Sequence, residues 1–177
     1  SIIAIDDNSI NYLKNHKGVS WPWTRDVYYP MLKFLNYSKA KAVVFDIDFF
    51  DLRDDEGEGQ DLQFKEALKL NKNTFLTAKL KESEDFKEKK ESETRIALNK
   101  NGIYHIDGLE EAKFRSYSHI QYPPQIFQSA VNGFGFTNIT FDKDGSIRKY
   151  NLFNLYKNTI VPSLAMKVFS ELTNVKD

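Results

Sequence analysis

The chain has 177 residues, of which 25 are basic and 25 acidic, and it contains no cysteine. The balanced charge excludes the strongly positive field that nucleic acid or an anionic lipid surface would attract, and the lack of cysteine excludes disulfides, thiol nucleophiles and thiolate metal sites. Because 41% of the residues are hydrophobic, we expect one domain over residues 1–177 with a continuous core.

The first expected element is a strand over residues 2–5, where an apolar run stops at Asp6 and Asp7. A short helix over residues 10–14 should follow, and then a rigid Trp-Pro-Trp turn within residues 21–25. Because the apolar run begins one residue into the chain, we interpret the sequence as a fragment of a longer protein.

Helices and strands then alternate. A longer helix is expected from Asp26, followed by a buried strand over residues 42–45 and a solvated acidic loop over residues 51–61. A helix over residues 62–70 and a strand over residues 74–78 continue the pattern. The order strand, helix, strand implies parallel pairing with right-handed crossovers.

The middle of the chain is dominated by charge. Residues 81–95 are mostly charged, with nearly balanced signs, and predict a solvated helix or loop without chemistry. This segment belongs to a charged surface insertion expected at residues 80–120. Within and after it, a short strand is expected over residues 103–106 and a helix over residues 125–131.

A hairpin is expected near the C-terminus. Residues 136–141 and 147–156 are extended apolar runs on either side of a turn at residues 142–146. Pro162 suits the first turn of a final amphipathic helix. The predicted fold class is therefore α/β, with a central mixed, largely parallel sheet flanked by helices, a C-terminal β-hairpin and a final helix.

Four aspartates are expected at one edge of this sheet. If the first two strands are parallel neighbours, Asp6, Asp7, Asp46 and Asp48 emerge at the carboxyl edge, where open α/β sheets bind ligands. Clustered carboxylates repel one another unless a cation or an arginine neutralises them. Asp6, Asp46 and Asp48 are therefore candidate magnesium or calcium ligands, and Arg25 is the nearest cationic side chain in the sequence. The same aspartates are also typical of strand ends and helix caps, and this alternative stays open.

An enzymatic alternative rests on Asp46 and Asp48. The segment before and through them resembles the nucleophile strand of haloacid-dehalogenase-type, magnesium-dependent phosphatases, but Phe49 and Phe50 stand where that family has Gly-Thr. The Asp-x-Asp-Gly at residues 142–145 predicts a hairpin turn rather than a calcium loop. No phosphate loop, dinucleotide-binding motif or nucleophile elbow occurs, so no cofactor is expected.

A series of short motifs occurs along the chain in a fixed order: Asp6-Asp7-x-Ser9, Trp21-Pro22-Trp23-x-Arg25, Val43-Val44-Phe45-Asp46, Asp61, Gly135-Phe136-x-Asn138, Asp142-x-Asp144-Gly145-x-x-Arg148 and Pro162-Ser163-Leu164-Ala165. In order and spacing these motifs resemble those of the CHASE2 sensor domain. The resemblance spans most of the chain outside residues 80–120, and Trp-Pro-Trp-x-Arg, at its distance from Ile-Asp-Asp, is its most distinctive part.

The resemblance implies the N-terminal portion of an extracytoplasmic sensory domain, the periplasmic part of a bacterial inner-membrane receptor. Its expected partners are an unidentified small molecule or ion, the receptor's own transmembrane helices, and a cytoplasmic output domain such as an adenylate cyclase or histidine kinase. A homodimer is also expected from the family. The chain itself is expected to bind rather than to catalyse, and a purely structural or dimerisation segment is a further alternative.

The candidate ligand-binding residues combine the acidic edge with the aromatic turn. Trp21 and Trp23 either line a pocket or clamp the first helix onto the sheet by packing. The full set is Asp6, Asp7, Trp21, Trp23, Arg25, Asp46 and Asp48.

Overall fold

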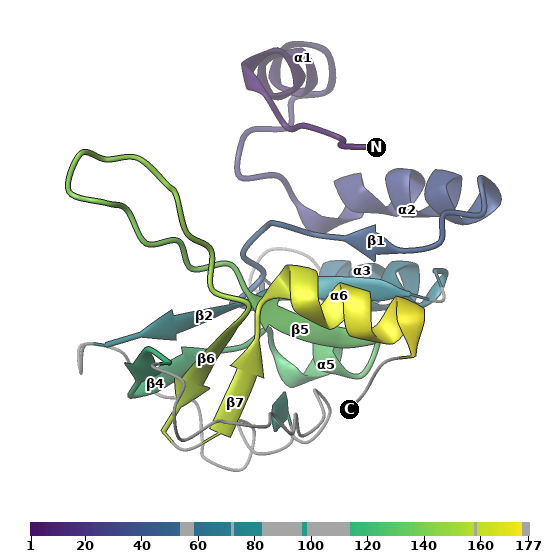
Figure 1. Cartoon of the computed structure of the whole chain (residues 1–177). Helices are drawn as coiled ribbons and strands as arrows, with labels where there is room; N and C mark the ends of the chain where they lie inside the picture. The colour runs from purple at the N-terminus through teal and green to yellow at the C-terminus, as the bar shows by residue number, and fades with distance from the viewer. Residues whose placement is uncertain (54–58, 72, 83–96, 99–113, 158, 175–177) are drawn as a thin grey trace.

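The computed structural model describes residues 1–53, 59–71, 73–82, 97–98, 114–157 and 159–174. They form two sheets with helices around the larger one (Figure 1). The expected mixed, mostly parallel α/β fold is confirmed. The strand expected over residues 103–106 lies outside the described part of the chain. The charged segment expected over residues 81–95 also lies outside it, except for residues 81 and 82.

The larger sheet is built around β2 (Thr74–Lys81). Two short strands run parallel to it, β1 (Val43–Val44) in register Val43↔Thr74 and β5 (Gly133–Phe136) in register Phe75↔Gly133. β4 (His119–Gln121) is antiparallel to the far end of β2, where Lys79 pairs with Gln121. Thr74, Phe75, Leu76, Thr77 and Ala78 are all buried, as expected for a strand covered on both faces.

The smaller sheet lies at the C-terminal side of the fold. β6 (Phe153–Tyr156) and β7 (Thr159–Pro162) are antiparallel, and β3 (Ser116–Tyr117) is parallel to β6. An isolated bridge between Phe136 and Ser163 connects the end of β5 to the residue after β7. The two sheets are thus joined where the final helix begins.

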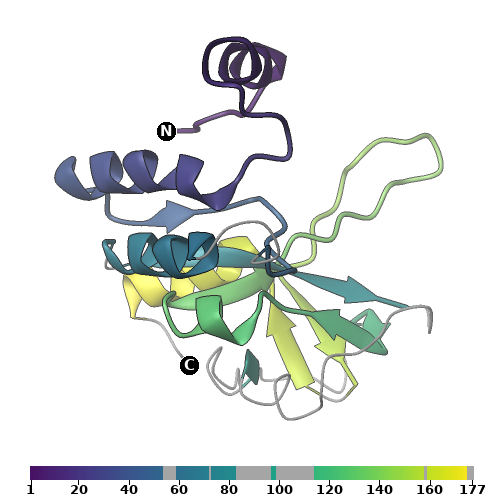
Figure 2. The same cartoon turned by 180° about the vertical axis from the view of Figure 1, so that it is seen from behind.

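Helices cover both faces of the larger sheet. α6 (Leu164–Thr173) lies on one face, and α3 (Gln60–Lys69) and α5 (Gln125–Gln128) lie on the other, as the two opposite views show (Figures 1 and 2). α2 (Tyr28–Tyr37) packs against α3. The helices expected from residues 26, 62, 125 and 162 are therefore present, although Pro162 is the last residue of β7 and the side chain of Ser163 caps α6.

Two glycines let α6 lie directly on β5. A Cβ atom on Gly135 would come within 2.3 Å of the backbone of Leu164, and one on Gly133 within 2.2 Å of the Lys167 side chain. Phe134 and Phe136 alternate with these glycines and are completely buried. On one face of β5 the backbone therefore contacts α6 directly. On the other face its two phenylalanine side chains pack into the core.

The centre of the core is aromatic. Phe45, Phe49 and Phe64 surround Tyr28 with ring centroids 5.3 to 6.0 Å away, and Phe127 packs on Phe64 at 5.3 Å. Most of these ring pairs are edge-to-face or tilted, the geometry that the ring quadrupole favours. This cluster joins the segment after β1 to α2, α3 and α5.

The strand expected over residues 2–5 is wrong. Ile2 and Ile3 are 95% and 59% exposed, and no described strand pairs with this segment. Instead α1 (Asp7–Lys17) begins immediately after Asp6, whose carboxylate accepts the Ser9 amide at 2.8 Å. The capping interaction at Asp6 starts a helix earlier in the chain than expected. Residues 2–5 have no adjacent strand with which their backbone could form hydrogen bonds, and a β-strand requires such a partner. The helix expected over residues 10–14 lies within α1, which projects from the body (Figure 1).

The hairpin expected on either side of residues 142–146 is displaced along the chain. The turn itself is present, with the Asp142 amide 2.8 Å from the Ser146 carbonyl oxygen. Residues 137–152, which we call the arm, form no strand, and the hairpin is made by β6 and β7 instead. At the base of the arm, the Asn138 side chain bonds to both the N–H and the C=O of Leu80, at 2.9 and 2.7 Å, in place of a continued β5. Among the described residues no helix is long and apolar enough to cross a membrane.

Candidate functional site

Arg25 is the centre of a buried polar junction. It starts the 3-10 helix η1 (Arg25–Val27), and its guanidinium pairs with the Asp61 carboxylate and donates to the Asp51 carbonyl oxygen. The other oxygen of Asp61 accepts the backbone N–H of Arg53 at 2.7 Å. Arg25 and Asp61 are 3% and 0% exposed. The pair thus joins η1, the segment after β1 and the first turn of α3.

Aromatic rings and a second arginine complete this junction. The Arg25 guanidinium carbon lies 4.6 Å from the centroid of the Phe127 ring, which provides a cation–π contact. The Arg53 guanidinium donates to the carbonyl oxygens of Pro22 and Trp23 at 3.0 and 3.1 Å. The Trp-Pro-Trp turn is therefore tied to the segment that follows β1.

The two tryptophans have different surroundings. Trp23 is buried and lies 6.2 Å from the Tyr28 ring, whereas Trp21 is 45% exposed and meets Trp23 edge-on at 5.3 Å. Burial raises the pKa of Tyr28, and the nearby Arg53 and Arg25 oppose that shift. Trp23 and Arg25 are thus packed into the core, and only Trp21 of the turn's aromatic residues presents a large face to solvent.

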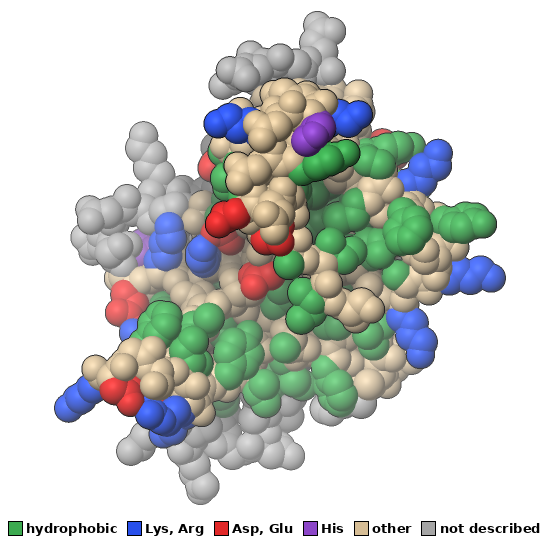
Figure 3. All heavy atoms as spheres, turned by 90° about the horizontal axis from the view of Figure 1, so that it is seen from above, with side chains coloured by type: hydrophobic (Ala, Val, Ile, Leu, Met, Phe, Trp, Pro, Cys, Tyr) green, Lys and Arg blue, Asp and Glu red, His purple; other side chains and the backbone are tan. Residues whose placement is uncertain are grey.

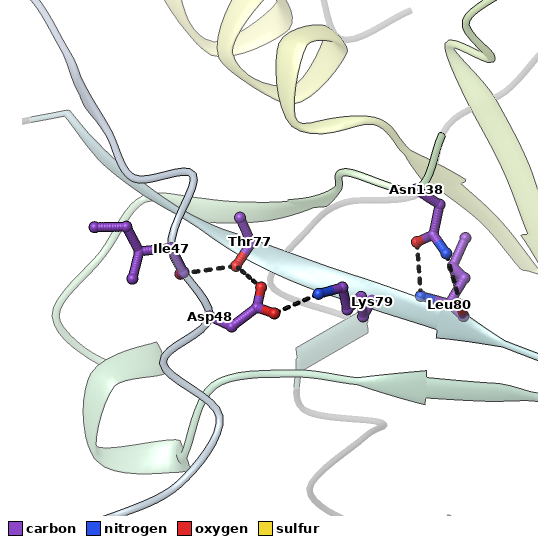
Figure 4. Close-up of polar contacts among 6 residues, drawn as sticks. All are labelled: Ile47, Asp48, Thr77, Lys79, Leu80 and Asn138. Carbon is purple, nitrogen blue, oxygen red and sulfur yellow. Dashed lines mark hydrogen bonds and ion pairs between the residues drawn. The ribbon is translucent and has the colours of Figure 1, made fainter. Parts of the chain in front are cut away.

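The carboxyl end of β1 holds a second polar group. After Val44 the chain stays bonded to β2 for one more residue, and the Asp48 carboxylate then pairs with the Lys79 ammonium of β2 (Figure 4). The Thr77 hydroxyl is 3.0 Å from the Ile47 carbonyl oxygen and 3.4 Å from the Asp48 carboxylate. A hydroxyl has one proton, so the shorter contact is the hydrogen bond and fixes the backbone beside Asp48.

This edge group is open to solvent. The side chains of Asp48 and Lys79 are 44% and 42% exposed, and Asp46 is exposed with no described residue bonded to its carboxylate. Figure 3 shows acidic side chains gathered near the middle of the face seen from above, with lysine and arginine side chains mostly nearer its rim. The edge therefore offers charges of both signs to a small solute.

Asp6 and Asp7 do not join this group. The Asp6 carboxylate accepts from the Ser9 hydroxyl at 2.6 Å and from the Ser9 amide, and these bonds lower its pKa. Asp7 is exposed in the first turn of α1. Within the described residues no three His, Asp or Glu side chains gather to hold a metal ion. The metal site expected from Asp6, Asp46 and Asp48 is therefore not assembled, because residues 2–5 are not the strand that was to bring Asp6 to the sheet edge.

Two shallow hollows in the described surface lie elsewhere. One, of about 390 Å³, is lined by Tyr29, Leu62, Gln63 and Glu66. The other, of about 410 Å³, is lined by Glu82, Ser116, Tyr117, Ser118 and Lys157. Burial raises the pKa of Tyr117 in the second hollow. Neither hollow is lined by any of the candidate ligand-binding residues predicted from the sequence.

Sequence reasoning missed the partners of its own candidates. Asp61 and Arg53 were not proposed as site residues, although a buried arginine such as Arg25 requires an acid within reach. Thr77 and Lys79 were missed too, yet their spacing of two residues in an apolar strand places them on one face beside the end of β1. Only the second omission has a visible signal, the polar residues that interrupt the apolar pattern of β2.

Comparison with known families gives one match. A family model described as the CHASE2 domain matches residues 1–176. Among curated proteins and among solved structures, none matches the chain.

Proposed function

The chain belongs to the CHASE2 family, extracytoplasmic sensory domains of signalling receptors, and we propose that it senses a small polar molecule or ion at the carboxyl edge of β1 and β2. The ligand would contact Asp46, Asp48 and Lys79. In the receptor the signal would pass through the membrane to a cytoplasmic cyclase or kinase.

The observation that carries the proposal is the exposed pair Asp48–Lys79, which lies two residues along the chain from Asp46, an exposed residue whose carboxylate has no bonded partner among the described residues. A half-exposed ion pair contributes little to stability, about 0–1 kcal/mol. A ligand that replaces one partner therefore displaces the pair at small cost. An ammonium group or a metal cation suits Asp46, and a carboxylate suits Lys79, so amino acids and small cations are the first ligands to test.

The chain from the edge to the buried junction supplies a path for the signal. Asp46 and Asp48 are followed within a few residues by Asp51 and Arg53, both of which are held at the junction. A ligand that shifts the backbone at residues 46–48 would act directly on a segment whose far end is anchored by the Arg25–Asp61 pair. Ligand affinity that differs between two positions of this segment is the physical requirement for sensing.

Binding rather than catalysis is proposed for the same edge. A phosphatase that uses Asp46 and Asp48 needs a magnesium ion held by further acidic ligands, whereas Asp48 is engaged by Lys79. Hydrolysis of a phosphate ester that is lost in Asp46→Asn would favour the enzymatic alternative over ours.

Thermal unfolding in the presence of single ligands tests the proposal. The panel holds magnesium, calcium, amino acids and small carboxylates, and a binder should raise the midpoint for the native chain. Asp46→Asn should reduce that rise, while Glu66→Gln, which removes an exposed carboxylate from α3, should leave it intact. An absence of any rise across the panel, or an equal rise in both variants, would contradict the edge as the binding site.

The receptor-level part of the proposal needs the whole protein. Cyclase or kinase output of the intact receptor should respond to the ligand found above, and the response should fall in Asp46→Asn. A reporter enzyme active only outside the cytoplasm, fused after residue 177, should be active if the domain is extracytoplasmic.

A further inference from the structure

The arm, residues 137–152, exposes large hydrophobic side chains that the core does not use. Figures 1 and 2 show it as a long narrow loop projecting from the body between β5 and β6. Five of its side chains are between 43% and 63% exposed: Ile139, Phe141, Ile147, Tyr150 and Leu152. Single exposed apolar residues need no explanation, but five on one projecting segment form a surface that water disfavours.

Ordered contacts at both ends hold the arm in shape. At the tip, Arg148 binds Asp142 at 2.9 Å and Asp144 at 2.7 Å, and the Ser146 amide donates to Asp144 at 3.0 Å. Near the base, Arg115 donates to the Thr140 hydroxyl at 3.2 Å. Because these contacts already order the arm, its use in binding costs less conformational entropy than that of a flexible loop.

From this arrangement we infer that the arm is a contact surface for a second copy of the chain. In a twofold dimer the same segment of each subunit meets its equivalent, so a self-complementary surface is sufficient. The arm meets that condition, because it carries charged side chains of both signs and Arg148 pairs internally with both tip carboxylates. Its extended backbone forms no strand within the chain, which leaves N–H and C=O groups for pairing with an identical arm.

The available area fits a dimer to which the arm contributes a large part of the interface. Aromatic side chains bury about 150–250 Å² each, and isoleucine and leucine are somewhat smaller, so five such side chains that are about half exposed present roughly 400 Å² of apolar surface. A standard interface takes about 800 Å² from each partner, of which somewhat more than half is apolar. The backbone and the polar side chains of the arm supply the remainder.

A lipid surface is a less suitable binding partner for the arm than a second copy of the chain. The outermost turn carries Asp142, Lys143 and Asp144, all exposed, and inserting such a turn into the apolar part of a bilayer is costly. The hydrophobic residues lie along the two sides of the arm and not at its end, so the arm suits a lateral protein contact.

Sedimentation velocity over a concentration series tests the inference. The native chain should associate to a dimer, and the double variant Phe141→Asp with Ile147→Asp should weaken association by about tenfold or more, because a charge is placed in the apolar contact. Phe34→Asp is the matched control: Phe34 is 64% exposed on α2, outside the arm, and its replacement should leave association unchanged. Circular dichroism checks that each variant keeps the native fold.

Spin labels give a second readout that does not depend on disruptive substitutions. The chain has no cysteine, so Lys149→Cys places a single label on the arm and Lys33→Cys a single label on α2. The arm label should give a shorter and narrower distance between subunits than the α2 label. A chain that stays monomeric at every concentration, or a dimer that Phe34→Asp weakens more than the arm variant does, would overturn the inference.

Discussion

The molecule contains two acid–base pairs of similar chemistry in opposite settings. Arg25 and Asp61 are buried and hydrogen bonded to the backbone of the segment after β1, and the Arg25 guanidinium lies over the ring of Phe127. Asp48 follows β1 and Lys79 lies on β2, and each side chain is nearly half exposed. Burial turns the first pair into a structural junction that cannot be opened cheaply, whereas solvent leaves the second free to exchange partners.

The largest effect should follow removal of the buried acid. Asp61→Ala leaves the Arg25 charge buried without its carboxylate and the Arg53 amide without its acceptor, so the free energy of unfolding should fall by about 3–5 kcal/mol. Urea unfolding followed by fluorescence measures this change. If the variant unfolded with native stability, the contrast between the two pairs would disappear.

A smaller loss is expected from Arg25→Lys. Lysine keeps the positive charge but loses the planar fork that reaches both Asp61 and the Asp51 carbonyl oxygen, and it loses the stacking on Phe127. The expected destabilisation is about 1–3 kcal/mol. A cost equal to that of Asp61→Ala would show that geometry matters as much as charge at the junction.

The exposed pair should contribute little to stability. Asp48→Asn should change the free energy of unfolding by less than about 1 kcal/mol, since the pair is screened by solvent. Lys79→Met should behave similarly, and both variants should alter the response to any ligand found at the edge. A large loss of stability in either would assign the edge pair a structural role and remove the distinction.

The smallest effect concerns a third pair, at the tip of the arm. Hydrogen bonds from Arg148, and then from the Ser146 amide, lower the pKa of Asp144 from 3.8 to about 2. A carboxylate with a lowered folded-state pKa contributes stability above its unfolded pKa and loses that contribution as pH falls from about 4 through about 2. In Arg148→Gln the Asp144 pKa should rise toward 3.8, which carboxyl NMR titration detects, while stability near neutral pH stays almost unchanged.

The periodic elements were predictable from the sequence because their patterns reflect burial. The strand at residues 74–78 is a run of apolar residues and threonines that is buried on both faces, and the helix after residue 60 shows an apolar stripe. Both depend on local periodicity, which the sequence displays directly. The family assignment likewise followed from the order and spacing of short motifs, and the family match confirms it.

The errors arose where a local pattern admits two structures. The run at residues 2–5 has strand composition, but a strand also needs a neighbour, and the cap at Asp6 begins α1 instead. That error also made the predicted metal site wrong, because the site required Asp6 to lie beside Asp46 at the edge of the sheet. The displaced hairpin has the same origin: the turn at residues 142–146 is local, whereas the departure of the arm depends on Asn138 reaching Leu80 across the sheet.

The bare glycine face of β5 has a mechanical consequence. The backbones of α6 and β5 approach so closely at Leu164 and Gly135 that no side chain separates them. A close-packed interior has little compressibility, so a push on the first turn of α6 is transmitted to the strand without slack. We therefore expect α6 and β5 to move together as one rigid unit. The fully buried Phe134 and Phe136 fix the opposite face of β5 in the core.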